Sequence, residues 1–244
     1  MALHLPTVNL TLDIGNTSTS AAIFNGAEIV IQAKIQKPEE LERILVNYRI
    51  SACAVSNVNA DDQIPQVIRA LSPITVDHKT NLPITVEYST PETLGSDRIC
   101  AAIGGHALYP NNTVLTVDLG TCIKYELITS DGIYKGGNIA PGMKMRYKSL
   151  ATGTANLPLI KAANRYSDFG RSTEEAIING VQLGIECEIE AMIERSKALF
   201  PDLITIMTGG DLPHFDKALK TTIFAHPLLV LHGLNEIILF NQSN

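Results

Sequence analysis

Two short segments of the chain repeat each other. Residues 10–15 read LTLDIG and residues 115–120 read LTVDLG. In each copy an apolar run leads into an Asp-x-Gly turn, which Asn16 and Thr17 follow in the first copy and Thr121 follows in the second. An internal repeat of this kind limits the fold to two copies of one supersecondary unit, each built around a strand that ends at its Asp-x-Gly turn.

The segments after the two turns are also alike. In the first half, residues 20–24 and 28–35 are β-prone and are joined by Asn25-Gly26. In the second half, residues 123–128 and 133–139 are β-prone and are joined by Ser130-Asp131-Gly132. Asn-Gly and Asp-Gly between β-prone runs indicate hairpins. Each half is therefore predicted to begin with a three-stranded antiparallel meander.

Helices and strands alternate in the rest of each half. Apolar spacing predicts helices over residues 38–48, 60–71, 97–108, 173–199 and 228–241, and strands over residues 51–56, 74–77 and 203–208. Two halves of the order βββαβαβα predict two stacked α/β domains with a cleft between them. A loop signal at residues 109–112 places the boundary there, which gives domains of residues 1–112 and 113–244.

The repeated Asp-x-Gly turn predicts a phosphate site. A single copy would be explained as a turn that ends a strand. Two copies at matched positions each supply a carboxylate for Mg²⁺ and a glycine that lets backbone amides approach phosphate. A cleft with one such turn on each wall suits the phosphate chain of a nucleotide.

Composition excludes several other classes of protein. The chain has 244 residues, 45% of them hydrophobic, and a net charge of −6, which argues against binding of a nucleic acid backbone. No basic stretch followed by an apolar one begins the sequence, and no apolar run has the roughly 18 residues of a membrane helix. The four cysteines and six histidines lack disulfide or metal-site spacing. We expect a cytoplasmic protein with reduced thiols and without nucleic acid or membrane partners.

The ordered set of motifs resembles one known family. Asp13-x-Gly-Asn-Thr17, Gly95-Ser-Asp-Arg98, Asp118-x-Gly-Thr121 and the glycine-rich residues 136–142 together resemble the type III pantothenate kinases. Those enzymes belong to the superfamily of acetate and sugar kinases, Hsp70 and actin. The resemblance implies two ribonuclease H-like (actin-like ATPase) domains with the active site between them. It also implies ATP-dependent phosphorylation of pantothenate to 4′-phosphopantothenate, the first step of coenzyme A biosynthesis.

The resemblance also implies roles for individual residues. Asp97 would be the general base, and Asp118 would bind a monovalent cation, K⁺ or NH₄⁺. Asp13, in the first of the repeated turns, is the carboxylate predicted to face Mg²⁺. The residues implied at the ATP phosphates are Asp13, Ile14, Gly15, Asn16, Thr17, Ser18, Thr19, Ser20 and Thr121. Those implied at pantothenate are Tyr88, Gly95, Ser96, Asp97, Arg98 and Thr173. Family members are homodimers in which the partner's Thr173 helps to close the substrate site.

The chain departs from the family pattern in two places, and other interpretations stay open. Ser18-Thr19-Ser20 stands where many members have a basic or amide residue, and Lys124-Tyr-Glu126 stands where many have Thr-x-Asp. The alternatives for function are another phosphotransferase on the same scaffold or an accessory transcription regulator. Asp97 and Arg98 would otherwise be a solvated pair in the first turn of a helix. Gly136-Gly137 and Pro141-Gly142 would be either a ligand contact or a tight strand-to-helix connection. Gly209-Gly210 would be either the place where adenosine approaches, as in the superfamily, or a helix cap region.

Overall fold

Each half of the chain begins with the antiparallel meander that the sequence predicts. The computed structural model describes residues 5–59, 64–215 and 219–243. The first meander consists of β1 (Thr7–Ile14), β2 (Thr19–Asn25) and β3 (Glu28–Ile35). The second consists of β7 (Val114–Leu119), β8 (Cys122–Ile128) and β9 (Ile133–Pro141). Gly26 and Gly132 have φ of 59° and 75°, the left-handed conformation that tight hairpin turns favour.

Parallel strands extend both meanders in the same way. In the first half, β4 (Arg49–Asn57) pairs with β1, and β5 (Ile74–Thr75) pairs with β4. In the second half, β10 (Ile204–Thr208) pairs with β7, and β11 (Phe224–Ala225) pairs with β10. The strand orders are β3-β2-β1-β4-β5 and β11-β10-β7-β8-β9-β6, where β6 (Thr85–Val86) is an addition at the edge. The repeat seen in the sequence is therefore a repeat of whole sheets.

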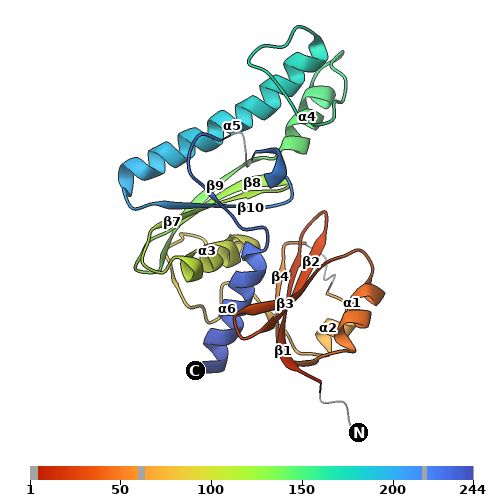
Figure 1. Ribbon diagram of the computed structural model, residues 1–244, viewed down its shortest axis with the longest axis vertical. Coiled ribbons are helices and arrows are strands. Elements are labelled where there is room, and N and C mark those ends of the chain that lie inside the picture. Colours follow the sequence, from red (N-terminus) through yellow and green to blue (C-terminus); the bar gives the residue numbers. More distant parts are fainter. Residues whose placement is uncertain (1–4, 60–63, 216–218, 244) are drawn as a thin grey trace.

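Two helices lie between the sheets, as Figure 1 shows. They are α3 (Ser96–Leu108) and α6 (Leu229–Ser243), which pack against each other. Glycines allow the close approach, because a Cβ at Gly233 would lie 1.9 Å from the Cys100 carbonyl oxygen. Helix α3 contacts β7 and β8, whereas α6 contacts β1 and β4, so each helix packs on the sheet of the other half. The division at residues 112 and 113 stays a prediction.

The remaining helices cover the outer faces of the sheets. Helices α1 (Pro38–Leu45) and α2 (Gln66–Arg69) lie on the first sheet, and α4 (Met143–Gly153) and α5 (Thr173–Leu199) lie on the second (Figure 1). Helix α5 buries an apolar stripe with helical spacing, at Ile177, Val181, Ile185, Ile189 and Ile193. No helix in the described part of the chain is long and apolar enough to cross a membrane.

Three features differ from the sequence prediction. The helix expected over residues 60–71 is limited to α2, which follows Pro65, and residues 60–63 lie outside the described residues. Between β10 and β11 the described residues form a single 3₁₀ turn, η2 (Leu212–His214), in place of a helix. Helix α4, which starts after Gly142, was not predicted, because its pattern is only weakly amphipathic. Another 3₁₀ turn, η1 (Pro91–Thr93), precedes α3.

Candidate active site

The two Asp-x-Gly turns meet at the ends of β1 and β7. The Thr17 and Thr121 hydroxyl oxygens lie 3.1 Å apart, and both side chains are exposed. The first turn closes when the Gly15 amide donates to the Ser18 carbonyl at 3.1 Å, and the second when the Gly120 amide donates to the Cys122 carbonyl at 3.1 Å. Residues 14–20 of the predicted phosphate site therefore form one wall, and Thr121 projects from the other.

Glycines on neighbouring segments support the second turn. A Cβ at Gly142 would lie 2.3 Å from the Gly120 carbonyl oxygen, and the Gly142 amide donates to the Thr121 carbonyl at 3.2 Å. Gly209 has a φ of 97°, and a Cβ there would lie 2.5 Å from Asp118 Oδ1. Both glycines are therefore required by close packing behind the turn.

An ammonium group lies between two of the predicted site carboxylates. Lys124 Nζ is 2.5 Å from Asp97 Oδ2 and 2.6 Å from Asp118 Oδ2. Lys124 is the direct cross-strand partner of Asp118 in the β7–β8 ladder. Burial lowers the pKa of Lys124, because it disfavours the charged form. The carboxylates of Asp118 and Asp97 have the larger combined effect and raise the pKa of the lysine. The hairpin thus fixes a positive charge in the cleft.

Asp13, the third carboxylate, is held differently. Burial, and then the nearby charges of Asp97 and Asp118, raise the pKa of Asp13 to about 7, while a hydrogen bond from Ser56 and the charge of Lys124 oppose the rise. Its Oδ1 atom is buried and has no hydrogen-bond partner among the described residues. A buried carboxylate oxygen without a donor is suited to a metal cation.

The start of α3 sets the position of Asp97. The Ser96 hydroxyl accepts a hydrogen bond from the Asn57 amide at 3.2 Å and lies 3.1 Å from the Ser56 hydroxyl, which ties the helix to the end of β4. The Arg98 amide donates to Asp97 Oδ1 at 2.8 Å. A Cβ at Gly95 would lie 2.7 Å from the same oxygen. Ser96 and Gly95 therefore hold Asp97 in place, with its other oxygen on Lys124.

Arg98 lies in a buried network beside this cluster. Its Nε and Nη2 donate to the two oxygens of Glu126 at 2.6 and 2.9 Å, and its Nη1 donates to the Tyr88 hydroxyl at 3.3 Å. The Tyr134 hydroxyl also donates to Glu126, at 2.5 Å. Burial raises the pKa of Glu126, although the bonds from Arg98 and Tyr134 oppose the rise. The interpretation of Asp97 and Arg98 as a solvated pair is wrong, because Arg98 is buried and pairs with Glu126.

The structure brings together most, but not all, of the predicted site. Tyr88 follows the edge strand β6 and reaches the cleft through Arg98. Thr173 is exposed in the first turn of α5, behind Ser172, whose hydroxyl accepts from the Glu175 amide. Within the described chain Thr173 makes no hydrogen bond to the cluster. Figure 1 places that end of α5 away from the first sheet.

Three residues at the site were not predicted as functional: Lys124, Glu126 and Ser56. The hairpin offered a signal for two of them. In the β7–β8 ladder Asp118 is opposite Lys124, and Thr116 is opposite Glu126, so both side chains lie on the face that carries Asp118. Ser56 lies at the end of β4, opposite Asp13 in the parallel ladder.

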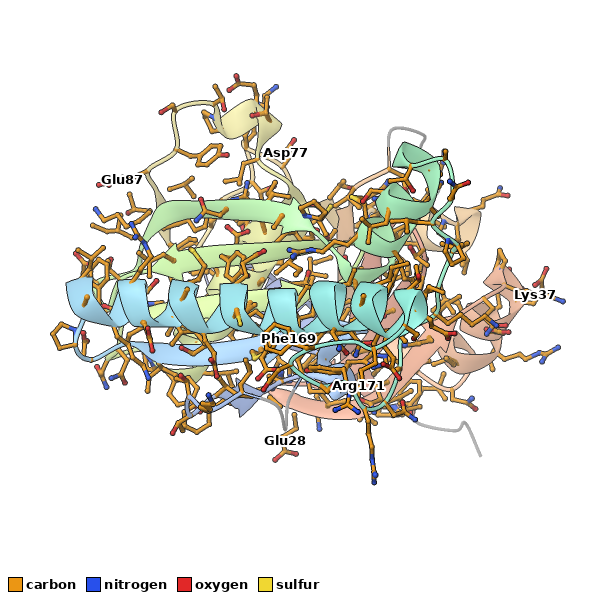
Figure 2. All side chains as sticks on the ribbon, turned by 90° about the horizontal axis from the view of Figure 1, so that it is seen from above. Glu28, Lys37, Asp77, Glu87, Phe169 and Arg171 are labelled. Carbon is orange, nitrogen blue, oxygen red and sulfur yellow. The ribbon has the colours of Figure 1, made fainter. Side chains whose placement is uncertain are left out.

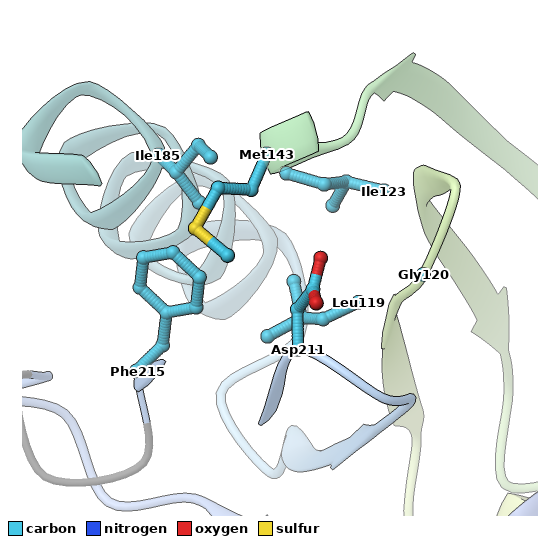
Figure 3. A pocket seen from close by; sticks show the side chains of 7 residues that line it. All are labelled: Leu119, Gly120, Ile123, Met143, Ile185, Asp211 and Phe215. Atoms are coloured by element: carbon cyan, nitrogen blue, oxygen red, sulfur yellow. The ribbon is translucent and has the colours of Figure 1, made fainter. Parts of the chain in front are cut away.

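A small pocket lies behind the second turn (Figure 3). It is lined by Leu119, Gly120, Ile123, Met143, Ile185, Asp211 and Phe215. The carboxylates of Asp13, Asp97 and Asp118 do not line it, so the two turns with these carboxylates, rather than this pocket, form the candidate site.

Comparisons with known sequences agree with these observations. Residues 9–195 match the sequence family described as type III pantothenate kinase. A type III pantothenate kinase of Bacteroides fragilis is 41% identical over 241 residues, which cover 97% of this chain and 99% of the relative. That of Phocaeicola vulgatus is 38% identical over 241 residues, with 97% and 100% covered.

Solved structures show the same fold. A Campylobacter jejuni protein described as a conserved Baf-family transcriptional activator has a TM-score of 0.64 at 21% identity, over 96% of this chain and 100% of that one. The ROK hexokinase of Thermus thermophilus has a TM-score of 0.51 at 12% identity, over 97% and 100%. At such identities the likeness concerns architecture alone, a fold of two ribonuclease H-like domains.

Proposed function

The chain belongs to the type III pantothenate kinase family, and we propose that its cleft transfers the terminal phosphoryl group of ATP to the 4′-hydroxyl of pantothenate with Asp97 as general base. The chain is accordingly an enzyme that uses ATP with a divalent metal. The observation that supports the proposal best is the meeting of the two Asp-x-Gly turns beside Asp97. The transcription-regulator alternative is not supported, because the Baf-family likeness concerns the fold only.

The two turns are proposed to bind the phosphates of ATP. Residues 13–20 would supply backbone amides and the Thr17 hydroxyl from one wall, and Thr121 would supply a hydroxyl from the other. The two hydroxyl oxygens lie 3.1 Å apart, so both can face one phosphate chain. Phosphoryl transfer depends mainly on such positioning and on neutralising charge.

Mg²⁺ is proposed to accompany ATP at Asp13. Asp13 Oδ1 is buried without a donor among the described residues, so it is available as a metal ligand. When bound, Mg²⁺ neutralises charge on phosphate oxygens. Magnesium usually keeps only one or two protein carboxylates and fills its other positions with water and phosphate oxygens, so one aspartate is sufficient.

Asp97 is proposed to accept the proton of the pantothenate hydroxyl. A general base must be ionised and within hydrogen-bond reach of the proton. Lys124 Nζ contacts Asp97 Oδ2 at 2.5 Å and holds the carboxylate in place. Tyr88, Gly95, Ser96 and Arg98 lie around this carboxylate and are proposed to contact pantothenate. Two nitrogens of Arg98 already pair with Glu126, so Nη1, which donates to the Tyr88 hydroxyl, is the nitrogen proposed to contact pantothenate.

A homodimer is proposed, with the partner's Thr173 closing the substrate site. On α5 the small residues Ala176 and Gly180 are exposed, and a Cβ at Gly180 or Gly184 would meet open space. Two such helices could approach closely along this stripe. Phe169, in the loop before α5, has 88% of its surface exposed (Figure 2), as expected of a side chain that a partner covers.

The resemblance also implies K⁺ or NH₄⁺ at Asp118. In this chain the site does not fit that ion, since Asp118 Oδ2 is already bound by the Lys124 ammonium at 2.6 Å. A free monovalent cation at Asp118 therefore has no part in the proposed reaction. A cytoplasmic location is proposed as well, in line with four free thiols and a reaction that consumes ATP.

A coupled ADP-release assay tests the proposed function. With Mg²⁺ and ATP, adding pantothenate should start ADP release, and mass spectrometry should detect phosphopantothenate. ADP release that does not depend on pantothenate, with no phosphorylated product, would overturn the proposal.

A further inference from the structure

We propose that the ammonium group of Lys124 is a built-in cation of the active site, which takes the place of a bound monovalent cation and makes catalysis independent of added K⁺ or NH₄⁺. The inference rests on the proposed kinase function. It makes Lys124 a positioning residue that holds Asp97 and Asp118 and supplies a fixed positive charge to the cleft.

The geometry is that of a cation site in which the cation, the Lys124 ammonium, is covalently attached to the chain. Lys124 Nζ lies 2.5 Å from Asp97 Oδ2 and 2.6 Å from Asp118 Oδ2, so one atom bridges carboxylates from α3 and β7. The lysine side chain is 17% exposed, and each aspartate side chain is 15% exposed. Because Lys124 is the cross-strand partner of Asp118, the β7–β8 ladder fixes where its side chain starts. An ammonium has three N–H donors, so one is left for a phosphate oxygen.

The charges around the cleft require such a cation. Asp97 and Asp118 share one ammonium group, Asp13 lies in the matching turn, and ATP adds several negative charges. The first phosphate turn, residues 14–20, contains no Lys or Arg. The charge of Arg98 is neutralised by Glu126, whose Oε1 lies 2.6 Å from Arg98 Nε. Lys124 therefore supplies a positive charge between two of the site carboxylates.

The lysine and a free alkali ion exclude each other. An ion bound to Asp97 Oδ2 and Asp118 Oδ2 would occupy the position of Nζ, or lie beside it and be repelled by a like charge. An alkali ion also needs oxygen ligands, and the lysine head group offers only N–H donors. The site therefore holds one cation or the other.

The test compares Lys124 variants in different salts at equal ionic strength. ADP release is measured in KCl, NH₄Cl and choline chloride. The wild type should have the same turnover in all three. Lys124→Met keeps the apolar stem and removes the charge, and should lower kcat by about a hundredfold in every salt. Lys124→Ala also opens space, and should regain at least about tenfold of that loss in KCl or NH₄Cl but none in choline chloride.

Lys135→Ala is the matched control. Lys135 is on β9 and pairs with Glu87 at 2.7 Å, with side chains 37% and 56% exposed, so the change removes the same charge outside the cleft. Figure 2 shows Glu87 at the periphery of the molecule. This variant should have wild-type turnover in all three salts.

Thermal unfolding without substrates gives a second readout. KCl should raise the melting temperature of Lys124→Ala above its value in choline chloride, because an ion that binds only the folded state stabilises it. The wild type should melt at the same temperature in both salts. A wild type that is inactive in choline chloride and activated by K⁺ would overturn the inference, as would full turnover of Lys124→Met.

The inference and the proposed function can fail separately. An enzyme without pantothenate-dependent ADP release in any salt would contradict the function. Melting in the two salts would still decide whether Lys124 fills a cation site. If Lys124→Ala does not fold, the salt dependence of the wild type decides the matter alone.

Discussion

The buried ion pair between Arg98 and Glu126 gives the sharpest prediction for stability. The two side chains are 6% and 1% exposed, and Arg98 Nε lies 2.6 Å from Glu126 Oε1. Glu126→Gln keeps the shape of the side chain and removes its charge. The variant leaves a buried guanidinium without a counter-ion, and breaking a buried pair in this way costs about 3–5 kcal/mol.

The contacts of Glu126 show why a glutamine cannot replace it. Both carboxylate oxygens accept, one from Arg98 Nε and the other from Arg98 Nη2 and the Tyr134 hydroxyl. An amide has one acceptor oxygen, and its NH₂ group would face N–H or O–H donors. The free energy of unfolding of most domains is about 5–15 kcal/mol, so this loss should remove a large part of the total stability.

Urea unfolding followed by circular dichroism measures this loss, because the chain contains no tryptophan for fluorescence. The midpoint for Glu126→Gln should fall while the m-value stays the same. Glu87→Gln, in the exposed pair with Lys135, is the control and should cost at most about 1 kcal/mol. The double variant Arg98→Met/Glu126→Leu should recover much of the stability, because apolar residues can replace a buried pair. Equal midpoints for Glu126→Gln and Glu87→Gln would show that the pair is not desolvated.

Three further predictions concern the cleft and the dimer. Asp97→Asn should keep ATP binding by calorimetry and lower turnover by at least about a hundredfold; near-wild-type turnover would assign the base elsewhere. Asp13→Asn should abolish Mg²⁺-dependent turnover. Because the pKa of Asp13 rises from 3.8 in the unfolded chain to about 7 in the fold, its folded state binds the proton more tightly, and wild-type stability should fall as pH rises through this window. The melting temperature of Asp13→Asn should therefore exceed that of the wild type by more at about pH 8 than at about pH 5, and a constant difference would contradict the shift. Gly180→Leu on the exposed stripe of α5 should weaken the dimer in sedimentation at assay concentration and lower activity with it; a fully active monomer would refute the shared site.

The sheets were the most predictable part of the fold. Turn residues with positive φ, Gly26 and Gly132, fix where the hairpins reverse, so the second and third strands of each meander lie within one or two residues of the predicted ranges. The repeated sequence also required that both halves place their strands in one order, which they do. Local sequence decides these features, and local sequence is what the repeat preserves.

The helices that lie between the sheets were less predictable in their packing. Their ranges follow from apolar spacing, but no local signal shows that α3 packs on the second sheet and α6 on the first. That arrangement depends on contacts between distant residues, such as Gly233 against the Cys100 carbonyl. Likewise, Asn9 Nδ2 donates to Asn235 Oδ1 at 3.2 Å, which joins β1 to the last helix.

In the site, the sequence indicated the carboxylates but not the charges that hold them. The two Asp-x-Gly turns and Asp97 were predicted, and the structure places Asp97 and Asp118 on one ammonium. Arg98 was expected to offer its guanidinium fork to a ligand, whereas two of its nitrogens bind Glu126. Counting the β7–β8 hairpin outward from its turn would have placed Lys124 opposite Asp118.

The repeat produces a symmetric frame, and one pair of residues makes the site asymmetric. Asp13 is opposite Ser20 in the first hairpin, and Asp118 is opposite Lys124 in the second. A serine adds no charge, and Asp13 keeps a buried oxygen without a donor among the described residues. Burial, and then the charges of Asp97 and Asp118, raise the pKa of Asp13. Lysine neutralises Asp118 from within the fold. Under the proposed function, the cation that accompanies ATP would bind Asp13 on the first wall, and the Lys124 ammonium is fixed on the second. A phosphate chain lying between the walls would have positive charge on both sides, which is the arrangement that phosphoryl transfer requires.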